Sequence, residues 1–115
     1  MNKKEKDLLL RDLCGRLPYE VILVAPNGKT VYQTDGNTGA ELLVEEGWKP
    51  YLRPMSSMTE EEANEFETIS EGLFTNEAPE QIWGEVIDWL NKNMFDYRGL
   101  IPMNLALEAP EGMYK

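Results

Sequence analysis

Residues 19–34 read YEVILVAPNGKTVYQT, and this stretch decides the fold class because it has the pattern of a β-hairpin. Residues 19–25 are rich in β-branched and apolar side chains, and residues 30–34 alternate between apolar and polar ones. Asn27 and Gly28 between them are typical of a tight turn, since both tolerate positive φ angles. We therefore predict two antiparallel strands joined at Asn27-Gly28.

The segment that follows the hairpin completes a small sheet in this interpretation. Residues 35–39 are predicted to form a second turn, and residues 40–45 a third strand with Leu42 and Val44 on one face. Three strands with one apolar face can pack on helices, whereas two alone would be marginally stable. Pro50 and Pro54 exclude residues 48–55 from a central strand, because proline cannot donate to the ladder.

Three stretches have the periodicity of amphipathic helices. Residues 4–17 place Cys14 on the apolar face of the first, where we expect a packed core thiol. Thr59 and Glu62 form the pattern of a capping box that begins the second helix. The third begins near Pro79 and is expected to bury a wide apolar face. That face holds Trp83, Val86, Ile87 and Leu90.

The sequence thus predicts a single α+β domain over residues 1–115. It would consist of an N-terminal helix, a small antiparallel three-stranded sheet and two principal C-terminal helices. Met103, Leu105 and Leu107 alternate, which permits an added strand, while Pro110 and Gly112 favour a loose end over residues 108–115.

Composition excludes several classes of function. The 115 residues include one cysteine and no histidine, so an internal disulfide, zinc sites of the usual histidine type and Ser-His-Asp chemistry are excluded. The longest apolar run, residues 21–25, is far shorter than the roughly 20 residues of a membrane span. A lone cysteine fits a reducing compartment, so we expect a cytoplasmic protein. We predict no catalytic residues, metal site or cofactor; a small enzyme using a carboxylate or Cys14 is the weaker alternative.

Charge is distributed unevenly along the chain. The net charge is −10; residues 1–58 carry 8 basic and 8 acidic side chains, and residues 59–115 carry 3 and 13. Such a surface repels nucleic acid and anionic membranes, and it suits a basic protein partner or an imitation of DNA phosphates. Acidic helix faces that only keep the protein soluble are the plainer alternative. The side chains expected to form the acidic surface are Glu60, Glu67, Glu71, Glu85 and Asp88.

Two short segments mix aromatic and basic side chains, as protein-binding surfaces do. The first segment contributes Trp48, Lys49, Tyr51 and Arg53, and the second contributes Tyr97 and Arg98. Packing across the sheet is the alternative for both segments.

Several blocks of the chain resemble a family of small uncharacterised proteins encoded by gut bacteria and their phages or other mobile elements. The blocks are KPYLRPMSSMTEEE at 49–62, DWLN at 88–91, FDYRGLI at 95–101 and LALEAP at 105–110, with the helix at 7–17. In that family a histidine often precedes the FDYRG block, where this chain has Met94. The resemblance implies an intracellular protein of phage or mobile-element type and names no reaction.

We therefore expect a non-enzymatic interaction module whose partner is another protein. An acidic DNA mimic that occupies a basic DNA-binding protein is the narrower alternative. We expect no direct binding to nucleic acid or membranes, and self-association into a homo-oligomer stays open.

Overall fold

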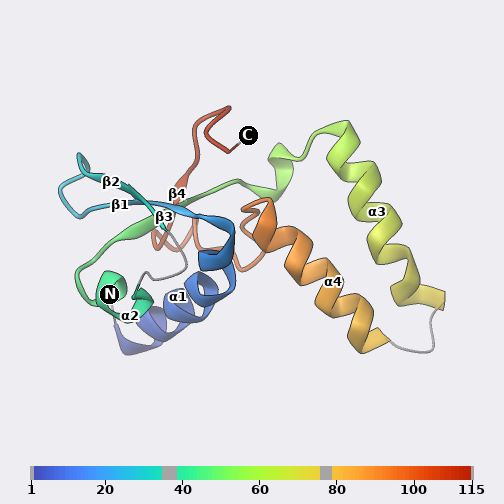
Figure 1. Ribbon diagram of the computed structural model, residues 1–115, viewed down its shortest axis with the longest axis horizontal. Coiled ribbons are helices and arrows are strands. Elements are labelled where there is room, and N and C mark those ends of the chain that lie inside the picture. The colour runs from blue at the N-terminus through green and yellow to red at the C-terminus, as the bar shows by residue number, and fades with distance from the viewer. Residues whose placement is uncertain (1, 35–38, 76–78, 115) are drawn as a thin grey trace.

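The computed structural model describes residues 2–34, 39–75 and 79–114, and within them it contains four α-helices and four short strands (Figure 1). The helices are α1 (Lys3–Arg16), α2 (Ala40–Glu45), α3 (Glu60–Thr75) and α4 (Pro79–Lys92). The strands are β1 (Ile22–Val24), β2 (Val31–Gln33), β3 (Lys49–Leu52) and β4 (Leu107–Glu108). This architecture confirms the predicted α+β class.

The strands form one sheet in the order β2-β1-β3-β4. β1 pairs antiparallel with β2, which confirms the hairpin, and also antiparallel with β3. β4 pairs parallel with β3. The sheet is therefore mixed and four-stranded, where we predicted three antiparallel strands. The turn expected at 35–39 lies mostly outside the described residues.

The hairpin turn needs a positive φ angle at one residue only. Gly28 has φ +73°, and its N–H donates to the Ala25 carbonyl at 2.9 Å. The Asn27 side chain accepts hydrogen bonds from the N–H groups of Lys29 and Thr30 at 2.8 and 3.1 Å. Asn27 thus closes the turn with its side chain, and Gly28 alone requires the left-handed conformation.

We expect Gly28→Val to lower the free energy of unfolding by about 1–3 kcal/mol, the range for a strained backbone position. Nothing lies within 4 Å of a Cβ built on Gly28, so the cost would come from the backbone alone. Gly84→Val is the matched control, because Gly84 lies within helix α4, has open space around an added Cβ and does not have a positive φ angle. Urea titration measures both variants, and equal losses would contradict the assigned role of the turn.

The third predicted strand is wrong, because residues 40–45 form helix α2. Ala40, Leu43 and Val44 are buried and Leu42 is 64% exposed. The buried residues are thus three and four positions after Ala40, which is the periodicity of a helix, and do not alternate as in a strand. Alanine, glutamate and leucine are also strong helix formers. The alternation of Leu42 and Val44 was therefore coincidental.

The exclusion of Pro50 from a central strand is also wrong, and the register explains why. Thr34 N–H donates to the Val21 carbonyl and Ala25 N–H to the Thr30 carbonyl. The backbone N–H and C=O groups of the odd-numbered residues, including Leu23, therefore point toward β2. Ile22 and Val24 then face β3, and the Leu23–Pro50 pair is a non-hydrogen-bonded pair. Pro50 therefore costs the β1–β3 ladder no hydrogen bond.

The helices α1 and α2 cover one face of the sheet (Figure 1). Leu9 and Leu13 of α1 are fully buried against Leu23 and Leu52. Cys14 is exposed, which corrects its predicted place in the core. The apolar stripe of α1 runs through Leu9 and Leu13, and Cys14 lies beside that stripe.

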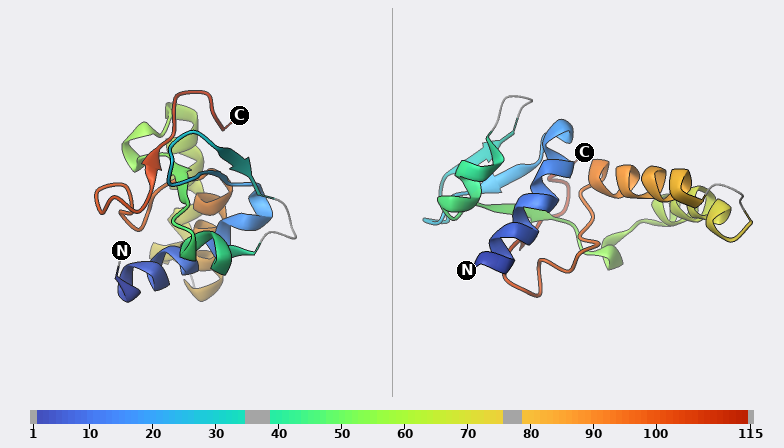
Figure 2. Two further views of the ribbon diagram at one scale, coloured as in Figure 1. Left: turned by 90° about the vertical axis from the view of Figure 1, so that its left-hand side faces the viewer. Right: turned by 90° about the horizontal axis from the view of Figure 1, so that it is seen from below.

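The helices α3 and α4 pack on each other and extend away from the sheet (Figure 2). Thr59 and Glu62 form the predicted capping box, with hydrogen bonds of 3.0 and 3.2 Å. On α4, Val86 and Leu90 are buried as predicted, but Trp83 is 56% exposed. Trp89, which is not among the four residues predicted for the apolar face, is buried and contacts Phe66 at 5.6 Å between ring centroids.

Two apolar clusters therefore form the core of this elongated protein of 46 × 28 × 27 Å. One, which we call the sheet cluster, lies between the sheet and helices α1 and α2, and the other lies between α3 and α4. Within the described part of the chain, none of the helices is long and apolar enough to cross a bilayer.

Candidate functional site

The aromatic-basic segment at 48–53 contributes most of its side chains to the fold. Lys49 and Tyr51 lie in β3 and are half-buried. Trp48 packs against the sheet cluster, contacts Tyr32 edge-on at 6.4 Å between centroids, and donates from its indole N–H to Glu46 at 3.2 Å. The segment therefore does not present its four candidate binding side chains on one open surface.

Arg53 joins the sheet to the helix pair. Its guanidinium donates two hydrogen bonds to the carboxylate of Glu62, at 2.6 and 2.7 Å, and lies 4.2 Å above the centre of the Phe95 ring. The hydrogen bond from Arg53 lowers the pKa of Glu62 to about 2. Glu62 thus serves both the capping box and this ion pair.

The second candidate pair, Tyr97 and Arg98, belongs to a polar network that sequence reasoning missed. Asp12 and Arg16 of α1 are fully buried and form a salt bridge of 2.8 Å. Arg98 donates to Asp12 at 3.2 Å and to the Tyr97 hydroxyl at the same distance. The Tyr97 hydroxyl donates in turn to Asn91 at 2.9 Å. One buried carboxylate therefore serves two guanidinium groups.

The sequence contains one local signal for this network. Asp12 and Arg16 are four residues apart on a helix, so their side chains are neighbours. The apolar periodicity of residues 4–17 does not include Asp12 or Arg16, so that periodicity alone does not predict that both are buried. Gly15 lies close to Asn91 of this network: a Cβ at residue 15 would be 2.8 Å from the side-chain amide nitrogen of Asn91.

The two candidate segments meet in the structure through their backbones. Arg53 N–H donates to the Met94 carbonyl and Asp96 N–H donates to the Arg53 carbonyl, both at 2.8 Å. The Asp96 carboxylate accepts the N–H groups of Leu100 and Ile101 at 2.8 and 2.9 Å. The KPYLRP and FDYRGLI blocks thus form a single structural joint, and an architectural role accounts for most of their side chains.

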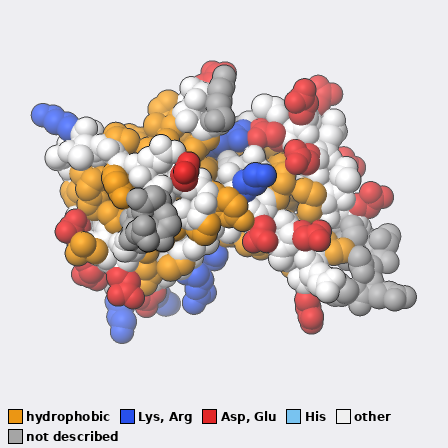
Figure 3. All heavy atoms as spheres, in the orientation of Figure 1, with side chains coloured by type: hydrophobic (Ala, Val, Ile, Leu, Met, Phe, Trp, Pro, Cys, Tyr) orange, Lys and Arg blue, Asp and Glu red, His pale blue; other side chains and the backbone are white. Residues whose placement is uncertain are grey.

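The acidic side chains present the contrasting case, because they point into solvent. All five candidates of the acidic surface are exposed, and so are three further carboxylates of the helix pair. The three are Glu61, Glu65 and Glu80. Figure 3 shows acidic groups over the α3–α4 part of the molecule. The sequence has no lysine or arginine between Thr59 and Asp88, so this stretch of the chain supplies only acidic charges.

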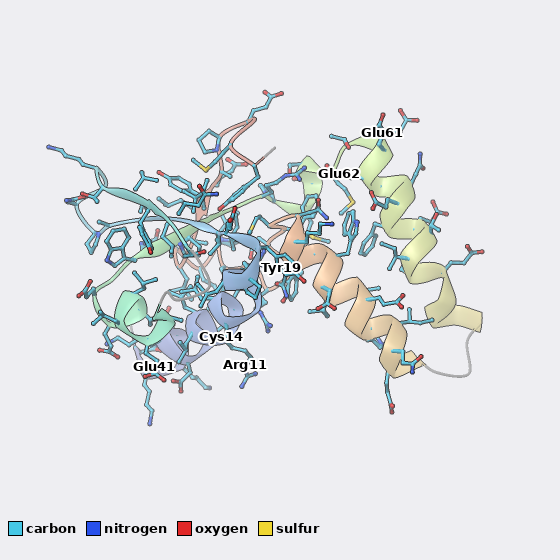
Figure 4. All side chains as sticks on the ribbon, viewed as in Figure 1. Arg11, Cys14, Tyr19, Glu41, Glu61 and Glu62 are labelled. Atoms are coloured by element: carbon cyan, nitrogen blue, oxygen red, sulfur yellow. The ribbon has the colours of Figure 1, made fainter. Side chains whose placement is uncertain are left out.

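A groove of about 860 Å³ lies where the start of α3 faces the C-terminal segment. Its polar lining includes Arg53 and Glu62, which bond to each other, and Glu61, Glu108 and Glu111. Figure 4 shows Glu61 and Glu62 at the beginning of α3. Among the described residues, no three side chains of the metal-ligating types gather closely enough to hold an ion.

In comparisons with known proteins, no family model, curated protein or solved structure matches the chain.

Proposed function

We propose that this protein is a non-enzymatic interaction module that binds a basic surface of another protein through the helix pair α3–α4. The observation that carries the proposal is the set of eight exposed carboxylates on these two helices, within a stretch that lacks basic residues up to Asp88. A cytoplasmic setting in a bacterium, and an origin in phage or a mobile element, belong to the same proposal.

The arrangement of the helix pair supports this assignment. Phe66, Val86, Trp89 and Leu90 pack together, so the two helices hold each other in place. Glu60, Glu67 and Glu71 share one side of α3 because they are seven and four residues apart. Carboxylates fixed on a folded helix pair attract a basic partner over about 8–10 Å at ordinary ionic strength.

The aromatic-basic candidates give weaker support to a binding surface. Arg53 is paired with Glu62, and Arg98 with Asp12, so either would have to leave a carboxylate before contacting a partner. Exposed carboxylates carry no such cost. The acidic helix pair is therefore the better candidate surface.

We expect the quadruple variant Glu60→Gln, Glu67→Gln, Glu71→Gln, Glu85→Gln to keep the fold and to slow association with the partner by tenfold or more at low salt. A pull-down from the native host at low and moderate salt identifies the partner, and stopped-flow kinetics measures association. The dependence of the rate on salt should also become flatter.

A charge-matched control separates the position of the charges from their number. Glu20, Glu41, Glu108 and Glu111 are exposed and lie outside α3 and α4. Replacing these four with Gln should slow association much less than the variant of the helix pair. Equal rates for the wild type and the helix-pair variant would refute recognition through charge. Competition by duplex DNA for the same partner would favour the narrower DNA-mimic form.

A further inference from the structure

The C-terminal residues 109–114 rise from β4 and fold back on the side of the sheet away from α1 and α2 (Figure 1), and we call them the strap. Ala109 N–H donates to the Leu52 carbonyl at 2.7 Å, which fixes the start of the strap. Tyr114, at its other end, packs against the sheet cluster. Between these ends, Met113 N–H donates to the Pro110 carbonyl at 3.1 Å, within the strap itself.

The Tyr114 hydroxyl occupies a specific place in the sheet. It accepts a hydrogen bond from Ile22 N–H at 2.8 Å and donates one to the Tyr51 carbonyl at 2.7 Å. Continuing the β1–β3 register places Ile22 opposite Tyr51, in a position whose backbone groups face each other. The phenol oxygen therefore lies between two backbone groups that would otherwise pair directly.

This insertion gives the end of the β1–β3 ladder two satisfied arrangements. With Tyr114 in place, the hydroxyl satisfies both backbone groups. With Tyr114 withdrawn, Ile22 N–H and the Tyr51 carbonyl can bond to each other as the next pair of the ladder, so neither is left unsatisfied. Withdrawal is therefore less costly than exposing two unpaired backbone groups.

We propose that the strap is a hinged cover, held closed by the Tyr114 hydroxyl and able to open as a unit from its attachment at Ala109. Opening would change the groove described above, because Glu108, Pro110, Glu111 and Tyr114 form one of its walls. The strap would thus control the shape of the groove. Burial of the Tyr114 side chain, which raises its pKa to about 12, is consistent with a closed resting state.

The test compares Tyr114→Phe with the wild type, because this change removes only the hydroxyl. A glutamate-specific protease can cut after Glu111 within the strap, and mass spectrometry measures the rate of that cut relative to cuts elsewhere. We expect Tyr114→Phe to raise the relative rate about tenfold, as expected when cleavage follows the population of the open form. Tyr19→Phe is the matched control, since Tyr19 lies at the protein surface in the turn after α1.

Each result decides the question. A selective increase at Glu111 in Tyr114→Phe, with Tyr19→Phe unchanged, supports the hinged cover. A wild-type rate at Glu111 would overturn it, because the hydroxyl would not hold the strap. Equal acceleration at all glutamate sites would also overturn it, because Tyr114 would then stabilise the whole domain rather than one opening segment. None of these results depends on the proposed partner.

Discussion

Asp12→Ala should lower the free energy of unfolding by about 3–5 kcal/mol, the usual cost of removing one partner of a buried ion pair. Arg16 has no solvent exposure, and Asp12 is its carboxylate partner. Without Asp12, the guanidinium would keep a hydrogen bond to the Phe95 carbonyl at 2.7 Å and its contact with the Tyr97 ring at 5.3 Å from the centroid, but it would have lost its carboxylate partner. Arg98 would lose the same carboxylate.

The double variant Asp12→Leu, Arg16→Met separates the cost of an unpaired charge from the cost of lost packing. Apolar replacement of a whole buried ion pair is often neutral or stabilising. We therefore expect the double variant to recover most of the stability lost by Asp12→Ala in urea titrations. If Asp12→Ala lowers the free energy of unfolding by less than about 1 kcal/mol, the role assigned to the pair is contradicted.

The sequence predicted the elements whose signals are local. The hairpin depends on a turn sequence, and the start of α3 on the spacing of Thr59 and Glu62; the structure confirms both. The predicted strand at 40–45 failed because a six-residue segment with mixed alternation fits a helix or a strand, and tertiary packing decides between them.

The centre of the sheet was not predictable for a different reason. Whether Pro50 is tolerated depends on which edge of β3 its nitrogen faces, and that depends on the register with β1. The backbone conformation just after the end of α4 could not be predicted either, because it also depends on tertiary packing. Met94 has φ +60°, where glycine is the usual residue, and its side chain is almost fully buried. Burial offsets the backbone strain there, and no local signal reports such burial.

The candidate site residues also fall into two groups, those predictable from local sequence and those whose role depends on distant neighbours. The acidic surface could be predicted, because exposed carboxylates follow from helix periodicity and composition. The interpretation of Arg53, Tyr97 and Arg98 as binding residues depended on knowing their neighbours. Their carboxylate and aromatic partners come from segments up to 86 residues away along the chain, as for Arg98 and Asp12.

Phe95→Ala should also lower the free energy of unfolding by about 3–5 kcal/mol, the range for truncating a fully buried phenylalanine. Phe95 has no exposed surface, stacks on Trp89 at 5.6 Å between ring centroids, and lies beneath the Arg53 guanidinium. The lost ring would leave a cavity at the joint between the sheet and the helix pair. The connection between the two parts of the molecule should weaken together with its stability.

Phe66→Ala is the matched control, because Phe66 contacts the same Trp89 ring but is only half-buried and belongs to α3 alone. We expect a smaller loss for Phe66→Ala, without separation of the unfolding transitions. For Phe95→Ala, tryptophan fluorescence and far-UV circular dichroism should give different midpoints in urea, because the helix pair would unfold before the sheet. Coincident midpoints with a loss equal to that of Phe66→Ala would refute the joint, since both rings would then contribute only local packing around Trp89.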